Sequence, residues 1–404
     1  MLNTLSQLRV LEFSHAVLGP ACGLTLADLG AEVIRVEPLT GDPTRELKGF
    51  GAGYYAFFNR NKKSVAINLK TEAGQALIYR LLESADVLIE NFGPGTMDRL
   101  GLGYEALTAD YPRLIYCSLK GFLPGPYANR LALDEVVQMM SGLAYMTGPA
   151  GRPLRAGASI IDIMGGTYGA IAILAALRER DATGKGQFVN SALFETAAFI
   201  MGHHMAYAAV TQEPVPPMPE RVSAWAIYRA FNAADDQLIF IGVTSDKQWA
   251  RFCEQFERPD WLADERLATN NGRIDQREWL IPQIADMIAG RSAADVLRRC
   301  EQAGIPFAPI ARPEELFDNE QLLQGGSLLE TQLPNGDQTR LPRLPLLLNG
   351  QGATLSQNPP TIGEHTRPLL TQLGLTNEEI EALIAAKIVT VAEKRSTDYA
   401  DFAD

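Results

Sequence analysis

Apolar runs alternate with helical stretches along the first third of the chain, and this alternation limits the fold more than any other feature. Strands are predicted at 8–13 and 31–37, where apolar residues run almost without interruption. The segment 20–30 between them has helical spacing and ends on a glycine, a common helix stop. The same order continues with a strand at 63–69, a helix at 72–85 and strands at 86–92 and 113–122. Because such a pattern is typical of a parallel sheet covered on both faces, we expect an α/β fold with a doubly wound, Rossmann-like large domain.

The rest of the chain contains a long helix, a proline-rich segment and a helical end. The helix is predicted over 162–180, and 211–224 is interpreted as a linker because it is rich in proline and lacks periodicity. Residues 335–348 begin with Asn-Gly, a turn dipeptide of β-hairpins. Near the end, Thr376 and Glu379 have the spacing of a capping box at a helix start.

Composition excludes several classes of function. The 404 residues carry a formal net charge of −12, which argues against nucleic acid or an acidic membrane surface as a partner. The four cysteines are widely spaced without a CxxC pair, so we expect no metal site and a reducing compartment. The N-terminus lacks the form of a signal peptide, and no apolar run of about 18 residues predicts a membrane span. We expect a cytoplasmic protein without a tightly bound cofactor.

The first strand–helix–strand unit invites comparison with dinucleotide-binding folds. Glu37 ends the second strand, where an acid that binds a ribose hydroxyl would lie. The turn after the first strand reads SHAVLGPACG, however, and lacks the G-x-G-x-x-G pattern, so a nicotinamide site is disfavoured. The helix that begins after Gly19 and Pro20 still has N–H groups for an anion.

Basic residues gather near strand ends and loops in this part of the chain. Singly, most of them are typical of solvated surface, whereas the run NRNKKSVAINLKT favours several cations beside a strand end. The loop ENFGPGTMDRLG follows a further strand and bends tightly at its glycines. A phosphorylated nucleotide ligand would suit these surroundings. The basic residues concerned are Arg35, Arg60, Lys62, Lys63, Lys70, Arg99 and Lys120.

Asp162 is an isolated carboxylate in an apolar run, and it has two interpretations that do not exclude each other. As an N-cap, it accepts N–H bonds at the start of the predicted helix. As a functional group, it is a carboxylate nucleophile that the helix dipole keeps ionised. Three glycines follow, and their missing side chains let either a substrate or another helix approach: Gly165, Gly166 and Gly169. His15, after the first strand, either contacts a ligand or caps the neighbouring helix.

Taken together, these segments resemble the class III CoA-transferases, the CaiB–BaiF type family. The likeness runs nearly from end to end of the chain. Single pieces are weak signals, but all of them in this order are specific. The pieces are LRVLEFSHAVLGPACGLTLADLGAEVIRVEP, GDPTR, FFNRNKKSVAINLKT, ADVLIENFGPGTMDRLGLGYE, SLKGF, DIMGGTYGAIAILAAL, TGKGQFVNSALFE, GIPFAPI and PPTIGEHT.

The resemblance implies a domain arrangement and an assembly. A large doubly wound CoA-binding domain is expected from 1–210 and 326–404, with a smaller α+β domain inserted at 225–325 after the 211–224 linker. The resemblance also implies a homodimer of two interlocked, ring-like subunits. Because such a dimer has a very large interface, no stable monomer is expected.

Site residues are implied position by position. Asp162 matches the family's nucleophile, which attacks an acyl-CoA thioester. The reaction then passes through an aspartyl anhydride and an aspartyl-CoA thioester before CoA reaches a carboxylic acid. Pro38 departs from relatives that have an arginine after the Glu37 position, which puts one phosphate contact in doubt. CoA contacts are implied for His15, Val17, Leu18, Lys70, Asn91, Phe92 and Arg99.

The family also contains acyl-CoA racemases, which need a second acid/base group one residue before the Asp134 position. That residue is Leu133 here, and because leucine cannot carry a proton, racemase activity is disfavoured. Asp134 itself is either a substrate-binding residue or the cap of a helix predicted over 134–145.

The segment 131–166 is most similar to the branch that uses succinyl-CoA with itaconate, mesaconate, malate or citramalate. A second carboxylate on the acid favours an arginine partner, and the candidates are Arg130, Arg152 and Arg155. Each of these is alternatively part of a surface ion pair. The remaining alternatives are a formyl-CoA/oxalate or carnitine-type CoA-transferase, a racemase, a non-catalytic CoA-binding protein and an NAD dehydrogenase.

Overall fold

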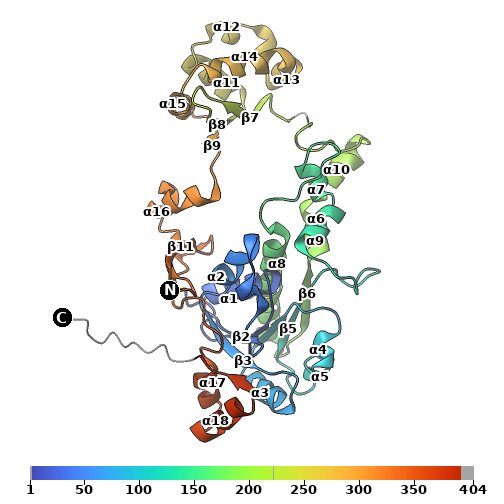
Figure 1. Ribbon diagram of the computed structural model, residues 1–404. Helices are drawn as coiled ribbons and strands as arrows, with labels where there is room; N and C mark the ends of the chain where they lie inside the picture. Colours follow the sequence, from blue (N-terminus) through green and yellow to red (C-terminus); the bar gives the residue numbers. More distant parts are fainter. Residues whose placement is uncertain (1, 222, 393–404) are drawn as a thin grey trace, which may run out of the picture. The chain divides into compact units, whose positions relative to one another are not determined.

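The computed structural model describes residues 2–221 and 223–392. The chain divides into two compact units, one of Met1–Pro219 with Gln321–Asp404 and one of Glu220–Glu320 (Figure 1). Residues 393–404, which belong to the predicted large domain, lie outside the described residues.

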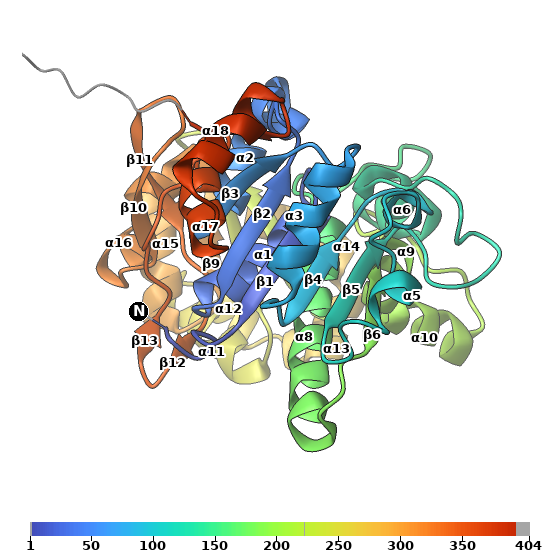
Figure 2. The same ribbon diagram turned by 90° about the horizontal axis from the view of Figure 1, so that it is seen from below.

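The first unit is built on a mostly parallel sheet, which confirms the predicted α/β class and parallel central sheet. The strand order is β14-β3-β2-β1-β4-β5-β6, and Figure 2 shows the six strands from β3 to β6 in this order side by side. Only β14 runs antiparallel to its neighbour β3, and this two-residue strand is too short to give a periodic signal in the sequence. The strands are β1 (Arg9–Phe13), β2 (Glu32–Glu37), β3 (Lys62–Ile67), β4 (Val87–Glu90), β5 (Ile115–Lys120), β6 (Phe188–Ala192) and β14 (Val389–Thr390).

Helices cover both faces of this sheet. Because alternate residues of a strand point to opposite sides, neighbouring residues enter different cores. Val10 of β1 belongs to a core with α1, α8 and α9, whereas the next residue, Leu11, belongs to a core with α3, α17 and α18. The helices on the first face are α1 (Leu18–Asp28), α8 (Ile160–Thr183) and α9 (Leu193–Ile200). Those on the second face are α3 (Glu72–Leu82), α17 (Thr366–Gln372) and α18 (Asn377–Ala385).

The long helix α8 packs on α1 at its glycines. A Cβ on Gly166 would lie 2.6 Å from the carbonyl oxygen of Leu18, and one on Gly165 would lie 3.0 Å from the Leu18 side chain. Of the two interpretations of these glycines, the structure therefore supports the approach of another helix. By length and composition α8 is also apolar enough to cross a membrane. Its place against α1 and the sheet explains that composition as that of a core helix.

Shorter elements complete the first unit. The predicted hairpin is present as β10 (Leu328–Gln332) and β11 (Gln338–Pro342), with Gly336 of the Asn-Gly turn at a φ of +97°. The predicted capping box between Thr376 and Glu379 is also present at the start of α18. The other elements are α2 (Tyr54–Phe58), α4 (Thr96–Arg99), α5 (Tyr104–Leu107), α6 (Asp134–Met140), α7 (Leu143–Thr147), α10 (Gly202–Thr211), β12 (Leu347–Leu348) and β13 (Gln351–Gly352).

The second unit has its own core beside a three-stranded antiparallel sheet with the order β7-β8-β9. Trp249, Phe252 and Trp261 are buried in that core. Its elements are β7 (Ile227–Asn232), β8 (Leu238–Val243), α11 (Asp246–Gln255), α12 (Pro259–Leu262), α13 (Asn270–Asp275), α14 (Arg277–Ala289), α15 (Ala293–Ala303) and β9 (Phe307–Pro309). The helix α16 (Glu320–Gln324) follows.

Candidate active site

The sheet has a point of divergence between β1 and β4. The chain leaves β1 through α1 to reach β2 on one side, whereas β4 pairs with β1 on the other side. In open α/β sheets, ligands bind in the crevice that this divergence leaves at the carboxyl ends of the strands. The loops that follow these two strands contain His15, Asn91 and Phe92.

Three residues expected to contact CoA meet at this crevice. The side chain of Asn91 accepts a hydrogen bond from the backbone N–H of His15 at 2.9 Å, and its amide donates to the His15 carbonyl at 3.0 Å. The His15 and Phe92 rings stack with their centroids 5.8 Å apart. Val17 and Leu18 follow directly at the start of α1, and both are buried. The structure thus brings five of the seven expected CoA residues into one region.

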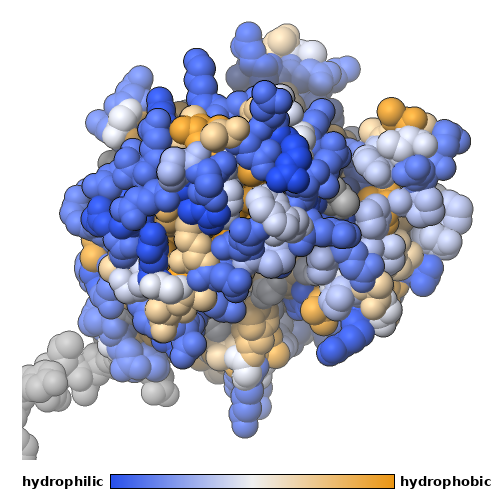
Figure 3. Space-filling model, turned by 90° about the horizontal axis from the view of Figure 1, so that it is seen from above, coloured by the Kyte–Doolittle hydropathy of each residue, from blue (hydrophilic) through white to orange (hydrophobic). Residues whose placement is uncertain are grey.

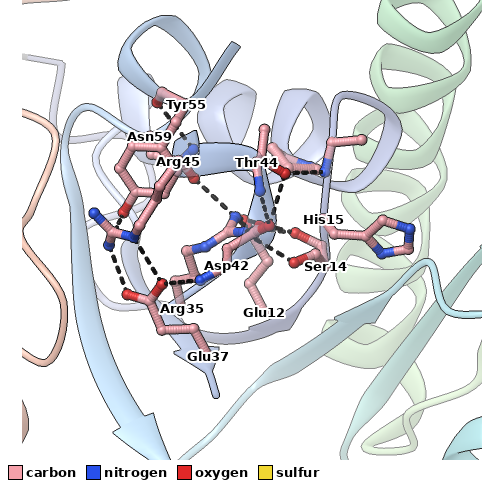
Figure 4. A network of polar contacts seen from close by, with 12 residues as sticks. Glu12, Ser14, His15, Arg35, Glu37, Asp42, Thr44, Arg45, Tyr55 and Asn59 are labelled. Carbon is pink, nitrogen blue, oxygen red and sulfur yellow. Dashed lines mark hydrogen bonds and ion pairs between the residues drawn. The ribbon is translucent and has the colours of Figure 1, made fainter. Parts of the chain in front are cut away.

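A buried polar network holds the turn that carries His15 (Figure 4). Arg35 donates to the Ser14 carbonyl at 2.9 Å and also contacts Asp42. Thr44 accepts the N–H of Ala16 at 3.0 Å, and Ala16 has a φ of +57°. In Figure 4 the His15 side chain points away from this network. The network therefore fixes the backbone of the turn and leaves its histidine available to a ligand.

Three of the basic residues considered as phosphate contacts are buried in ion pairs instead. Lys62 lies 2.8 Å from Glu12 and Arg60 lies 2.7 Å from Asp28, and Arg35 also pairs with Glu12. Burial lowers the pKa of Lys62 to about 8. Both interpretations of these three residues, solvated surface and phosphate contact, are therefore wrong. Charges removed from water require partners, and the sequence run alone did not reveal those partners.

Of the other four basic residues, two form ion pairs and two are exposed. Lys63 pairs with Glu32, and Lys120 pairs with Glu90 at 2.6 Å. Lys70, after β3, and Arg99, at the end of α4, are exposed, and Arg99 bonds to Thr96 within its own turn. Of the seven basic residues considered, these two exposed ones are also the two that the resemblance assigned to CoA.

Glu37 does not occupy a ligand-binding position. Its carboxylate is buried and accepts hydrogen bonds from Arg45, Ser64 and the N–H of Asp42. The comparison with a ribose-binding acid is therefore wrong. Glu37 holds the loop after β2 in place, since its oxygens already have several partners inside the protein.

Asp162 lies on the first turn of α8, half-buried, but it is not the N-cap as expected. Ser159 occupies that position and makes no side-chain capping bond. The cap comes from Asp134, whose Oδ2 accepts the N–H groups of Ile161 and Asp162 at 2.9 and 3.1 Å. Asp134 is the first residue of α6, a helix that ends at Met140 and not at residue 145. It caps α8, which was not among the predicted interpretations.

The electrostatics of Asp162 also differ from expectation. Burial and the nearby Asp134 carboxylate raise its pKa to about 7, against a smaller opposite effect of Arg155. The helix dipole alone predicted a carboxylate that stays ionised. Desolvation and a like charge outweigh that dipole here.

Of the candidate arginines, the structure brings Arg155 to this carboxylate pair. Its guanidinium lies 3.4 Å from Asp134 and is about one-quarter exposed. Arg130 is exposed and lies over the ring of Tyr127, and Arg152 is exposed as well. Leu133 is exposed beside Asp134 and offers no group for proton transfer. Gln138, which sequence reasoning missed, is buried four residues after Asp134 and bonds to it.

Comparisons with known proteins identify the family of the chain. The family model described as "CoA-transferase family III" matches residues 5–366. The chain belongs to CoA-transferase family III. It is therefore a CoA-transferase, as the resemblance implied. Within the described residues, no group of three or more His, Cys, Asp or Glu side chains is arranged to hold a metal ion.

Individual relatives align with almost the whole of this chain. The human succinyl-CoA:glutarate CoA-transferase is 31% identical over 96% of this chain and 90% of its own length. A protein from Chloroflexus aurantiacus, succinyl-CoA–D-citramalate CoA-transferase, is 31% identical over 95% of this chain and 98% of its own. The crystal structure of a CaiB/BaiF family protein from Brucella suis is similar with a TM-score of 0.81, at 32% identity, over 91% of this chain and 98% of that one.

Proposed function

We propose that this enzyme transfers CoA from succinyl-CoA to a small dicarboxylic acid, with Asp162 as the nucleophile. The observation that carries the proposal is the position of Asp162, an aspartate that bears a raised pKa on a capped helix start next to a second carboxylate and an arginine. A carboxyl group with a perturbed pKa beside a specific charged partner is typical of a functional site.

The reaction proceeds in steps that each exchange one acyl bond. The Asp162 carboxylate attacks the thioester carbonyl of succinyl-CoA, forming an aspartyl anhydride and releasing CoA thiolate. The thiolate then attacks the aspartyl carbonyl, which gives an aspartyl-CoA thioester and free succinate. The acceptor carboxylate attacks that thioester and forms a second anhydride, and the released thiolate attacks its acceptor carbonyl. The new acyl-CoA leaves and the Asp162 carboxylate is regenerated.

The CoA moiety is proposed to bind at the crevice between β1 and β4. His15 and Phe92 offer a stacked pair of rings, and the start of α1 at Val17 and Leu18 offers N–H groups to an anion. Lys70 and Arg99 are exposed cations suited to phosphate groups. Because Leu18 packs against α8 next to Gly165, this crevice adjoins the helix turn that bears Asp162.

The acceptor is proposed to be a dicarboxylate such as glutarate, citramalate, malate, itaconate or mesaconate. Arg155 supports this choice, since a guanidinium binds a second carboxylate in a fixed geometry. The names of the human and Chloroflexus relatives, which state glutarate and citramalate, support the same class. Asp134 is not proposed to bind substrate, because its oxygens already accept bonds from the protein.

A homodimer is the proposed working form. Large apolar side chains are exposed along α8, α9 and α10, including Ile171, Phe199 at 74% and Val210 at 84% exposure. On the face drawn in Figure 3, hydrophobic patches interrupt a mostly hydrophilic surface. Exposed large apolar side chains on neighbouring helices are typical of an interface. Light scattering measures the mass of the purified protein in solution. A mass of twice the chain would support the dimer, and the mass of one chain would contradict it.

The transfer reaction itself can be tested directly. The protein is incubated with succinyl-CoA and a panel of dicarboxylic acids, with oxalate and carnitine as alternatives, and new thioesters are identified by mass spectrometry. Asp162→Ala runs alongside. A new dicarboxylyl-CoA that is absent with the variant supports the proposal. Equal product from both proteins would contradict the aspartyl mechanism, and product with oxalate or carnitine alone would contradict the acceptor class.

A further inference from the structure

The start of α8 depends on a residue from elsewhere in the chain. The first N–H groups of a helix have no partner within it, and a side chain at the N-cap usually accepts one of them. Ser159 at this position makes no such bond. Asp134 accepts two of these N–H groups instead, those of Ile161 and Asp162, with a single carboxylate oxygen.

Asp134 is itself fixed from two sides. Its Oδ1 accepts from the amide of Gln138 at 2.5 Å and lies 3.4 Å from Arg155. The oxygen of the same Gln138 amide accepts the N–H of Ala156 at 2.8 Å. The segment that leads into α8 is thereby tied to α6. Asp134 is buried, so its charge acts on Asp162 through little water.

We propose that Asp134 is a positioning residue of the transfer reaction: it fixes the helix turn that bears Asp162 and places a second carboxylate beside that nucleophile. The inference rests on the proposed role of Asp162 and deepens it. Fixing the turn sets the direction of the attacking carboxylate, and a misplaced nucleophile loses rate without losing substrate affinity. The added negative charge makes the carboxylate more basic, which strengthens it as a nucleophile.

Other charges near Asp162 do not perform this task. Arg155 carries the opposite charge and is itself shared between Asp134 and Glu135, 3.8 Å away. From α1 and α9, the residues next to the Gly165 position are Leu18, Leu193 and Thr196, which are uncharged. Among the described residues, the acid that acts on Asp162 is Asp134, whose carboxylate accepts the Asp162 N–H.

The test separates the capping oxygen from the charge. Asp134→Asn retains an oxygen for the two N–H groups but removes the charge, whereas Asp134→Ala removes both. For each, kcat, both KM values and the pH dependence of kcat/KM are measured, with Asp181→Asn on the exposed last turn of α8 as control. Thermal unfolding verifies that each variant is folded, and Asp162→Ala tests the underlying mechanism separately.

The two variants are expected to differ. Asp134→Ala should lower kcat by about 30-fold or more with both KM values within about twofold, because the interaction is made through the nucleophile. Asp134→Asn should restore kcat to within about threefold of wild type at high pH and move the midpoint of kcat/KM about one pH unit lower. The control should match wild type in both.

Three outcomes would overturn the inference. A rise in the KM of the acid as the main effect would make Asp134 a substrate-binding residue. An equal loss of kcat for Asn and Ala, with an unmoved midpoint, would show a merely structural role. Wild-type kinetics in both would remove any role. If Asp162→Ala is fully active, the proposed function fails first, and this result is distinct from the other three.

Discussion

Gly166 of α8 lies against the backbone of Leu18, so closely that a Cβ at this glycine would come within 2.6 Å of the Leu18 carbonyl oxygen. This contact sets the distance between α1 and α8. It also joins the turn after β1 to the helix turn that carries Asp162. The geometry of the proposed site therefore depends on a residue that has no functional group.

Gly166→Ala should destabilise the protein despite the higher helix propensity of alanine. The new methyl group would meet backbone, which cannot move without shifting a helix, so we expect a loss of about 2–3 kcal/mol in the free energy of unfolding. Gly202→Ala, at the start of α10 with nothing within 4 Å of its Cβ position, is the matched control and should cost nothing. Urea unfolding measures both. Equal stability of the two variants would contradict the close packing of α1 on α8.

Asp162→Asn should stabilise the protein at neutral and alkaline pH. The folded pKa of about 7 lies above the value of about 3.9 in an unfolded chain. Below the unfolded pKa both states are protonated; as pH rises toward 7, the unfolded chain ionises first and stability is lost. Asparagine does not titrate, so the variant does not lose this stability. Its free energy of unfolding should exceed that of wild type by on the order of 2 kcal/mol at pH 8, after allowance for partial exposure.

The measurement compares urea midpoints of the two proteins from pH 4.5 to pH 8. The gap in favour of Asp162→Asn should grow with pH and level off above the folded pKa. Asp181→Asn, on the exposed end of the same helix, controls for removal of a carboxylate as such. A gap that is constant with pH would show that the carboxyl group titrates alike in both states.

Thr44→Val should weaken CoA binding while leaving turnover largely intact. The hydroxyl of Thr44 accepts the N–H of Ala16 in the left-handed turn next to His15, and valine removes that acceptor at almost constant volume. We expect the Kd for CoA to rise about fivefold to tenfold, the effect of roughly one hydrogen bond. Thr44→Ser keeps the hydroxyl and should bind as wild type does. Calorimetric titration with CoA measures both, and unchanged affinity in Thr44→Val would separate this turn from the CoA site.

Arg155→Met should discriminate between acids with one and two carboxylates. The methionine side chain keeps apolar bulk but loses the guanidinium, so KM for a dicarboxylic acceptor should rise by about tenfold or more. KM for a monocarboxylic acid of equal chain length should change little. Arg130→Met, whose arginine lies over Tyr127, is the control. A loss equal for both acids would assign Arg155 to general structure.

Much of the fold could be predicted because its signals are local. The strands of the sheet and the helices between them follow from apolar periodicity within about a dozen residues, and the hairpin and the capping box follow from short turn and cap motifs. The strand β14 escaped prediction, since two residues that pair with β3 from the far end of the chain carry no period of their own.

The candidate site was predicted less evenly. Asp162 and the cluster of His15, Asn91 and Phe92 were recognised from a family pattern, and the structure brings the latter three into contact. Gln138 went unnoticed, because nothing in its spacing says that its amide faces a carboxylate rather than the core.

By itself, the sequence determined the alternation of strands and helices, the family, and the candidate nucleophile. Only the tertiary structure decided which charges remain exposed and which are paired inside. Arg35 and Lys62 look like surface cations in the sequence, yet both bind the buried Glu12, and Asp134 caps a helix that begins 26 residues later. The physical reason is that propensity and periodicity act between neighbours in the chain, whereas ion pairs, caps and desolvation depend on residues that only folding brings together.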